Sequence, residues 1–461
     1  MTHLNWKTSL KRALSRAHVL SAVRSLHYQF RRTVDRDFRN QESVREQEFR
    51  EFSSEYGAAF RHLLPEQHGL ARQVLIVSSG SLGLLVEIAL VKAFQAAGYH
   101  PVVLTDYDRW VDAFYREAGI QDLLCWDEFV RLSPDAEAVR IMADVASFEQ
   151  LLALDYGGIR VGKYAASTAL RHLRVGRLDL TNQAVRDALL PFLQRSLSYA
   201  KAAQNIVKTV RPQLVLSVDL GYSPRGELFD VCLAAGLETI TWNAAHKNNQ
   251  LMLKRYSRAN RDVHPASLSV RTWHDLQAQP WTHAERERLR RELVGSYLSG
   301  EWYGEVGTQF HTTLQEAAEI RRALDLDDRK KTAVIFSHIF WDGTFFYGTD
   351  LFGSYEEWFV ETMKVACANP HLNWIVKIHP ANIVKNVRDG VGSEPSELTA
   401  IRSLGETLPA HVRVVQPDSH MSTLSLYSVI DYCVTVRGTV GIEAACFGIP
   451  VLTAGTGRYD R

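Results

Sequence analysis

Residues that could bind a phosphate stand together near the end of this chain. Residues 432–436 form an apolar, β-branched run typical of a buried strand, and Gly438 and Thr439 separate it from a helical pattern that begins at Val440. The first backbone N–H groups of a helix have no partner within the helix and favour an anion. Gly438 has no side chain to block a phosphate, and Thr439 offers a hydroxyl group and a helix cap. We therefore predict a phosphate site at this turn.

Glu443 lies one helical turn beyond Thr439, on the same face of the predicted helix. Its carboxylate could accept hydrogen bonds from a ribose diol while the phosphates lie at the helix start. Residues 450–453 form the next predicted strand, so the unit is a strand–helix–strand crossover of a parallel sheet. The alternative is an ordinary strand-to-helix turn in which Thr439 only caps the helix and Glu443 is solvated.

A cation and an imidazole follow another predicted strand of the same region. Lys377 and His379 stand two residues apart at the carboxyl end of the run 374–378, so their side chains project to the same side. Because they face a helix start from the same sheet edge, they could hold a monophosphate or a diphosphate. The alternative for His379 is a hydrogen-bonded histidine of the core.

The N-terminal half contains a small-residue turn after its first predicted strand. Residues 74–77 form this strand, and residues 78–83, which include Gly80 and Ser81, form the turn. The turn lacks the third glycine of the dinucleotide motif GxGxxG, so an NAD site is not expected. Since ligands of open α/β sheets bind at the carboxyl ends of the strands, we predict that Gly80 and Ser81 face a substrate.

Two residues of this half are candidates for a catalytic base. Asp219 follows the predicted strand 214–218 at its carboxyl end, where catalytic groups of such sheets gather. A turn or N-cap role is an equally good interpretation of Asp219. His246 follows the predicted strand 238–242 and could act as a base or a phosphate ligand, although a lone histidine in a loop is more often neither.

These segments require two lobes, because each set of strand ends belongs to its own run of alternating strands and helices. We predict an α/β protein with two Rossmann-like parallel-sheet lobes that face one cleft. The predicted parts are a basic helical extension over 1–70, an N-terminal lobe over 71–265, a helical connector over 266–330 and a C-terminal lobe over 331–461.

Composition and charge narrow the class of protein. The chain has 461 residues, of which 46% are apolar and 23% charged, as in globular proteins that fold in water. Its formal net charge of +1 does not favour a nucleic acid as partner. The five cysteines show no zinc-ligand spacing and fit reduced thiols of the cytosol. The sequence has no 18-residue apolar run and no signal-peptide core, so neither a membrane span nor secretion is predicted.

The first forty residues differ from the rest of the chain. They carry nine lysine and arginine residues against two aspartates, interspersed with apolar residues such as Trp6, Leu26 and Phe30. This pattern is typical of a basic helix that lies on an anionic membrane or on a partner. The alternative is a solvated helical extension. Both interpretations place the chain in the cytoplasm, and the first attaches it peripherally to the inner face of the cytoplasmic membrane.

Three motifs of the C-terminal lobe resemble those of a known family. They are SHIFWDG at 337–343, KIHP at 377–380 and RGTVGIEAACFGIPVLTAGTGRY at 437–459. The segments SSGSLGLLVEIA and DLGYSPRG of the N-terminal lobe agree more loosely. The chain thereby resembles the capsule polysaccharide biosynthesis proteins, a branch of the two-lobed GT-B glycosyltransferases, over most of its length after residue 70.

The resemblance implies a role for each candidate residue. Phosphate would be held by His379 and the Gly438–Thr439 turn, the ribose by Glu443, and Asp342 would lie at the mouth of the cleft. The full donor-nucleotide set would be Lys377, His379, Gly438, Thr439, Glu443, Ser337 and Asp342. Gly80 and Ser81 would face the acceptor, and the base would be Asp219 or, as second choice, His246.

The implied activity is transfer of a sugar from a nucleotide donor to a surface polysaccharide of capsule or lipopolysaccharide type, or to its lipid-linked primer. No cofactor and no bound metal are expected. GT-B proteins usually continue with helices that return to the N-terminal lobe, and this chain stops at Arg461, so either the sequence is a fragment with an apparently truncated C-terminus or the closing helices of the family are absent. The alternatives are a sugar-nucleotide epimerase of the same fold and a capsule assembly or export component without turnover.

Overall fold

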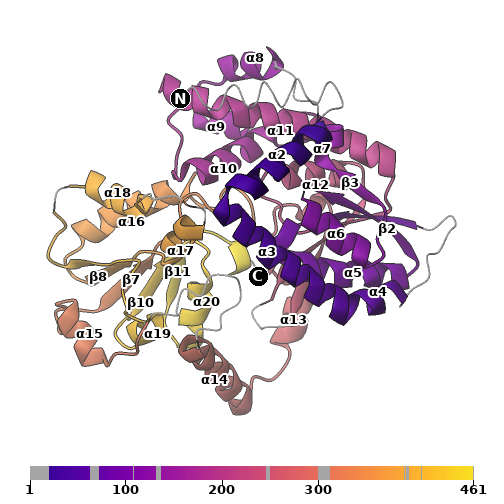
Figure 1. The fold of residues 1–461 in the computed structure, drawn as a ribbon. Helices are drawn as coiled ribbons and strands as arrows, with labels where there is room; N and C mark the ends of the chain where they lie inside the picture. Colours follow the sequence, from indigo (N-terminus) through magenta and orange to yellow (C-terminus); the bar gives the residue numbers. More distant parts are fainter. Residues whose placement is uncertain are drawn as a thin grey trace.

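Two sheets organise the chain in the computed structural model (Figure 1). The structure describes residues 20–62, 72–106, 108–130, 136–245, 250–299, 312–388, 390, 394–405 and 407–459. The strands of the first sheet are β1 (Arg72–Val77), β2 (Tyr99–Thr105), β3 (Leu123–Cys125), β4 (Leu214–Ser217), β5 (Glu238–Ala244) and β6 (Leu251–Tyr256). Those of the second are β7 (Thr332–Phe336), β8 (Asn373–Lys377), β9 (Val412–Val415), β10 (Tyr432–Thr435) and β11 (Val451–Thr453).

Both sheets have the strand order of a Rossmann fold. The first runs β3-β2-β1-β4-β5-β6 and the second β11-β10-β7-β8-β9, so the first five strands of each lobe follow the order 3-2-1-4-5. Neighbouring strands of the described sheets pair in parallel, except that β6 pairs antiparallel with β5. This topology confirms the predicted α/β fold with two Rossmann-like parallel-sheet lobes.

Helices cover both faces of the first sheet. The helices up to the end of this lobe are α2 (Leu20–Val34), α3 (Arg36–Phe52), α4 (Ala58–His62), α5 (Leu84–Ala96), α6 (Arg109–Glu117), α7 (Trp126–Phe129), α8 (Ala136–Asp144), α9 (Phe148–Leu152), α10 (Val161–Leu173), α11 (Gln183–Val210) and α12 (Arg225–Ala234). Alternate strand residues enter different cores: Leu75 packs with α10–α12, whereas Val74 and Ile76 pack with α3, α5 and α6.

The second lobe is built the same way. Its helices are α16 (Tyr355–Ala368), α17 (Ala381–Arg388), α18 (Ser396–Ser403), α19 (Thr423–Leu426) and α20 (Thr439–Cys446), and α13 (Val270–Gln277), α14 (His283–Ser299) and α15 (Ala317–Ala323) lie between the lobes in the sequence. Ile335 and Val376 pack under α16, whereas Phe336 and Ile375 pack on the face that α19 and α20 cover. Lys377, two residues after Ile375, therefore projects toward the α20 face.

The N-terminal helices differ from the expected extension. Helix α3 packs on the first lobe, where Phe52 and Phe49 contact Phe114 at ring-centroid distances of 5.0 and 5.3 Å. These buried aromatic contacts make α3 part of the lobe's core. Helix α2 precedes it and packs mainly on α3 (Figure 1), and residues 1–19 of the basic segment lie outside the described residues.

Strand β6 was not expected from the sequence. Its exposed residues alternate with half-buried ones, and Leu251 and Leu253 remain exposed at the edge of the sheet. Since no face of β6 enters the core as a continuous apolar stripe, its periodicity gives little signal. The strand is formed by its antiparallel pairing with β5.

Candidate functional site

The carboxyl ends of β7 and β10 lie side by side at the point where the strand order of the second sheet reverses. His338 follows β7 and Gly438 follows β10, so both occupy the crevice in which open α/β sheets bind ligands. The Nε2 atom of His338 accepts a hydrogen bond from the backbone N–H of Arg437 at 3.3 Å. The predicted turn is thus tied to the end of the neighbouring strand.

The start of α20 carries no side-chain cap. Gly438 is the N-cap residue, with φ −67° and ψ 149°, and Thr439 is the first residue of the helix. The expectation that Thr439 caps the helix is therefore wrong, and its hydroxyl instead bonds the carboxylate of Glu443 one turn further on. In the first turn, the N–H of Gly441 donates to the carbonyl oxygen of Gly438 at 3.1 Å, so an anion would meet the N–H groups of Thr439 and Val440.

Lys377 is buried and weakly partnered. Its side chain is 7% exposed, and its Nζ donates one long hydrogen bond of 3.4 Å, to the carbonyl oxygen of Met421. Burial lowers the pKa of Lys377 to about 8. No carboxylate of the described residues forms an ion pair with it. A buried ammonium with spare donors is a good ligand for a phosphate.

The two histidines of the site are neutral near pH 7. Burial and then Lys385 lower the pKa of His379 to about 4, and burial and then His379 lower that of His338 to about 3. The Nδ1 atom of His379 accepts a hydrogen bond of 3.1 Å from the N–H of Ala381. Its proton is therefore on Nε2, which can donate a hydrogen bond to a ligand.

Ser337 supports His379 and points away from α20. Its hydroxyl oxygen accepts the backbone N–H of His379 at 3.0 Å, and the hydroxyl lies 3.4 Å from Oε1 of Glu397. Glu397 also accepts a 2.7 Å hydrogen bond from Asn382, and burial raises its pKa to about 7. In this arrangement Ser337 positions the loop after β8 through hydrogen bonds within the protein.

Asp342 joins the two lobes. It forms an ion pair with Lys385 of α17, accepts a 3.0 Å hydrogen bond from the hydroxyl of Tyr222, and lies 3.8 Å from Arg171 of α10. Burial alone would raise the pKa of Asp342, but Lys385 and Arg171 outweigh it and hold this pKa below the usual value. The predicted cleft residue is thus held by cations from both sides.

Asp219 lies at the equivalent reversal point of the first sheet, after β4. Its Oδ1 atom accepts hydrogen bonds from the N–H of Gly221 at 3.0 Å and from the hydroxyl of Tyr347, in the second lobe, at 2.7 Å. The first bond gives Asp219 the turn role considered from the sequence, and the second ties it to the other lobe. His246, the other candidate base, lies outside the described residues.

The small-residue turn after β1 is held from beneath by Glu87. Its carboxylate accepts the N–H of Ser79 at 2.8 Å and the hydroxyl of Ser78 at 3.0 Å. Gly80 has φ +79°, which favours glycine, and the backbone of Ser81 continues in the 3-10 helix Gly80–Gly83. Because β1 and β4 are paired, this turn and Asp219 share one sheet edge.

Glu443 is neither solvated nor open. Its side chain is 7% exposed, and its Oε2 atom accepts hydrogen bonds from Tyr297 of α14 and from Tyr427, the latter at 3.3 Å. Burial raises the pKa of Glu443. A ribose diol would therefore compete with Tyr297 for this carboxylate.

Electrostatic contacts join these residues into one site. Asp342 acts on the pKa values of both His338 and His379. Arg171 is half-buried, and partial burial opposes its charge, yet Tyr222, Asp342 and Asp219 together raise its pKa. The residues of the second lobe and Asp219 of the first thus face a common region between the lobes.

The sequence missed His338, Arg171 and Lys385. His338 could have been found, because it stands two residues after the predicted strand 332–336, at the sheet edge where His379 lies. Lys385 lies on the helix that follows the KIHP motif, and Arg171 lies in a helical region with no motif. Their approach to Asp342 depends on how the lobes meet.

Among the described residues, no group of three or more His, Cys, Asp or Glu side chains is arranged as a metal site. None of the helices in the described ranges has the length and apolar character that a membrane span requires.

Comparison with known proteins gave structural neighbours only, since neither a protein-family model nor a curated protein matches the chain. KpsC of Thermosulfurimonas dismutans, a beta Kdo 2,4 transferase, is similar over 53% of this chain and 69% of its own, with 12% identity and a TM-score of 0.32. UDP-GlcNAc 2-epimerase from Neisseria meningitidis is similar over 83% of this chain and 82% of its own, with 11% identity and a TM-score of 0.24.

The glycotransferase of kitacinnamycin is similar over 84% of this chain and 81% of its own, with 15% identity and a TM-score of 0.20. At these TM-scores the likeness carries no functional weight. The neighbours include transferases and an epimerase, so the residues of this chain must distinguish the two activities.

Proposed function

We propose that this protein transfers a sugar from a nucleotide donor to a surface glycan or to its lipid-linked primer. The observation that carries the proposal is the donor-side site of the second lobe. An uncapped helix start, the weakly partnered ammonium of Lys377 and the Nε2–H group of His379 gather at one sheet edge. Such groups suit a diphosphate or a monophosphate.

The proposed reaction uses both lobes. The hydroxyl oxygen of the acceptor forms a bond to the anomeric carbon of the sugar, and the bond from that carbon to the phosphate oxygen breaks. The electron pair of the breaking bond leaves with the nucleotide, where Lys377, His379 and the α20 start stabilise the developing negative charge. The acceptor's proton passes to the carboxylate of Asp219 and then to solvent. No cofactor or metal ion takes part in this proposal.

The epimerase alternative uses the same donor site but needs no acceptor. Incubation with UDP-, CMP- or GDP-linked sugars alone separates the two, because only an epimerase forms the epimeric sugar nucleotide without an acceptor. The proposed transferase consumes the donor when cell-derived glycan is added. Nucleotide binding without either conversion would favour an assembly component of the capsule machinery.

Binding of a nucleoside diphosphate should depend on pH through Lys377. A phosphate prefers the ammonium form, and the pKa of Lys377 is about 8 in the free protein. Affinity should therefore fall about tenfold between pH 7 and pH 9, because the charged fraction falls by that factor. Calorimetric titration with UDP, CDP, GDP and CMP measures this change in affinity and identifies the nucleobase of the donor.

Lys377→Met is the matched variant, since it keeps an unbranched side chain of similar length and removes the charge. It should bind weakly at both pH values and lose the dependence on pH. Unfolding of the parent protein at high pH would not explain the fall in its affinity for the nucleotide. The folded state holds the Lys377 proton less tightly than the unfolded chain, so its titration makes the protein more stable as pH rises above 8. An affinity that is constant from pH 7 to pH 9 would refute this role of Lys377.

We also propose that helix α2 attaches the protein to an anionic membrane surface, as the basic N-terminal sequence predicts. Leu26, Phe30 and Val34 are 70%, 64% and 59% exposed and recur every four residues, so they form one apolar stripe on α2. Arg32, Arg36 and Arg39 are exposed nearby in the sequence. An apolar stripe beside arginines suits the headgroup region of anionic lipid.

Vesicle flotation tests the membrane proposal. The protein should float with vesicles that contain phosphatidylglycerol and much less with phosphatidylcholine alone. Replacing Leu26, Phe30 and Val34 by serine should abolish flotation, whereas Leu452→Ser should not, although Leu452 is 69% exposed. Equal flotation of the triple variant and the parent would exclude α2 as the attachment site. Concentration-dependent dimerisation that requires the stripe would instead identify a second copy as its partner.

A further inference from the structure

The segment after β7 crosses from the second lobe into the first. This segment, residues 343–350, is called the aromatic loop below. Phe345 and Tyr347 have φ values of +64° and +71°. Bulky residues rarely adopt this left-handed conformation, which costs on the order of 1–3 kcal/mol for each residue. The surrounding contacts must therefore hold the loop in place.

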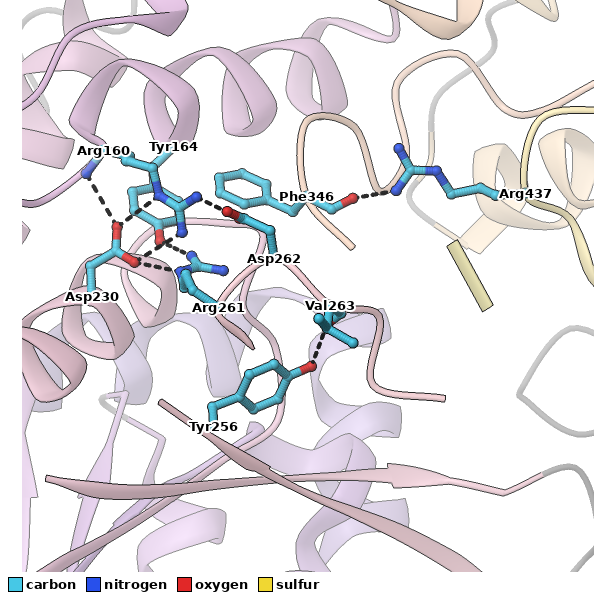
Figure 2. A network of polar contacts seen from close by, with 9 residues as sticks. All are labelled: Arg160, Tyr164, Asp230, Tyr256, Arg261, Asp262, Val263, Phe346 and Arg437. Atoms are coloured by element: carbon cyan, nitrogen blue, oxygen red, sulfur yellow. Dashed lines mark hydrogen bonds and ion pairs between the residues drawn. The ribbon is translucent and has the colours of Figure 1, made fainter. Parts of the chain in front are cut away.

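Phe346 anchors the aromatic loop in the first lobe. Its side chain is fully buried and stacks on the ring of Tyr164, with centroids 4.9 Å apart and planes 10° apart. The guanidinium groups of Arg160 and Arg261 lie 5.6 and 5.4 Å from the centroid of the Phe346 ring. Figure 2 shows how Asp230 holds these two arginines beside the ring through ion pairs. The loop is thus fixed to α10 and α12.

Arg437 anchors the same loop in the second lobe. Its guanidinium donates to the carbonyl oxygen of Phe346 (Figure 2) and forms an ion pair with Asp350. Arg437 is 5% exposed and directly precedes Gly438 of the phosphate turn. The residue that holds the aromatic loop in the second lobe is therefore bonded directly to the first residue of the phosphate turn.

Tyr347 connects the loop to the acceptor side. Its hydroxyl donates to Oδ1 of Asp219 at 2.7 Å and accepts the N–H of Leu220 at 3.3 Å. The ring also belongs to the partly buried residues packed on the core of the first lobe. A single hydroxyl from the second lobe thus orients both the carboxylate and the backbone of the turn after β4.

We infer that Tyr347 is a positioning residue for sugar transfer. Its hydroxyl holds the carboxylate of Asp219, and the aromatic loop connects this contact to Arg437, which directly precedes the phosphate turn. The inference rests on the proposed function, because it assigns Tyr347 to the same transfer reaction. A residue that acts through Asp219 should change turnover and leave donor binding nearly unchanged.

Tyr347→Phe tests the inference, because it removes the hydroxyl and keeps the ring. With cell-derived glycan as acceptor and the UDP-, CMP- or GDP-linked sugar that the protein consumes, kcat should fall about tenfold and KM for the donor should stay within about twofold. Tyr256→Phe is the control. The hydroxyl of Tyr256, a buried residue, also donates one hydrogen bond, to the backbone carbonyl oxygen of Val263 at 2.9 Å (Figure 2), but it has no contact with Asp219 among the described hydrogen bonds. Loss of this hydroxyl should leave kcat unchanged.

A double-mutant cycle separates positioning from general stabilisation. In an Asp219→Asn background, Tyr347→Phe should cause no further loss of kcat, because the group through which it acts is gone. Multiplicative losses in the double variant would overturn the inference, as would an unchanged kcat in Tyr347→Phe. Should the parent protein consume no donor with any acceptor, the proposed function fails and the inference falls with it. Loss of folding in Tyr347→Phe, seen by circular dichroism, would show a structural role and also overturn it.

Discussion

Replacing His379 by alanine should lower turnover on the order of 100-fold while donor binding changes little. The Nε2–H group of His379 is proposed to meet the phosphate as negative charge develops on it, so its contribution grows in the transition state. Because the pKa of His379 is about 4, the imidazole acts as a neutral donor, and turnover should not depend on its titration near pH 7. Steady-state kinetics with the donor that the nucleotide screen identifies measures the effect.

Two conservative variants show which nitrogen matters. His379→Asn places an amide near Nδ1, where it can still accept the N–H of Ala381, and His379→Gln places one near Nε2. Glutamine should restore part of the turnover and asparagine should not. If asparagine restores more turnover than glutamine, the role of His379 is to support the start of α17. Full turnover in His379→Ala would show that His379 does not belong to the donor site.

Glu443→Gln provides the contrast, because its effect should fall on donor binding. Loss of a charge-assisted hydrogen bond to the ribose should weaken binding by about 1.5–3 kcal/mol. In the structure Tyr297 occupies this carboxylate, so Tyr297→Phe should strengthen donor binding by removing a competitor. Unchanged donor affinity in both variants would leave Glu443 as an anchor between α20 and α14.

Arg437→Ala should have the largest effect on stability. The guanidinium is 5% exposed, and its ion pair with Asp350 joins it to the aromatic loop. Removing one member of a buried ion pair leaves the other charge without its partner, at a cost of about 3–5 kcal/mol. Burial lowers the pKa of Arg437 to about 10, yet it remains charged at neutral pH, so the full loss should appear at pH 7. Denaturant unfolding of the parent and variant measures the difference.

Arg402→Ala is the matched control for Arg437. Arg402 pairs with Glu394 on the surface, where the two side chains are 59% and 46% exposed. Exposed ion pairs contribute at most about 1 kcal/mol, because water screens them. Equal destabilisation by the two variants would contradict the view that the Arg437–Asp350 pair holds the loop.

The local sequence pattern was sufficient to predict the fold and the location of the candidate donor site. Alternating strands and helices predicted two parallel lobes, and the strand order confirms them. Lys377, His379 and Gly438 each lie at or just beyond the carboxyl end of a predicted strand, and these ends of parallel strands meet at one edge of a sheet. Periodicity of two and of 3.6 residues is written into consecutive residues, so it can be read without tertiary structure.

Tertiary structure alone decided what each side chain contacts. Asp342 and Tyr222 are 120 residues apart in the sequence, and Glu443 and Tyr297 are 146 apart. No local pattern encodes such pairs, because they depend on how the lobes and the connector pack. For this reason the sequence predicted Glu443 as an open carboxylate, whereas packing of α14 buries it beneath two tyrosine hydroxyls.

The contacts of the aromatic loop could not be predicted from the sequence for the same reason. Residues 343–350 show no strand or helix period, and their three aromatic residues indicate a core without saying which one. Their burial in the opposite lobe follows from the stacking of Phe346 on Tyr164 and from the bond of Tyr347 to Asp219. The sequence determined which residues stand at the sheet edges, and only the packing of one lobe on the other determined their partners, because burial and charge pairing are properties of the assembled chain.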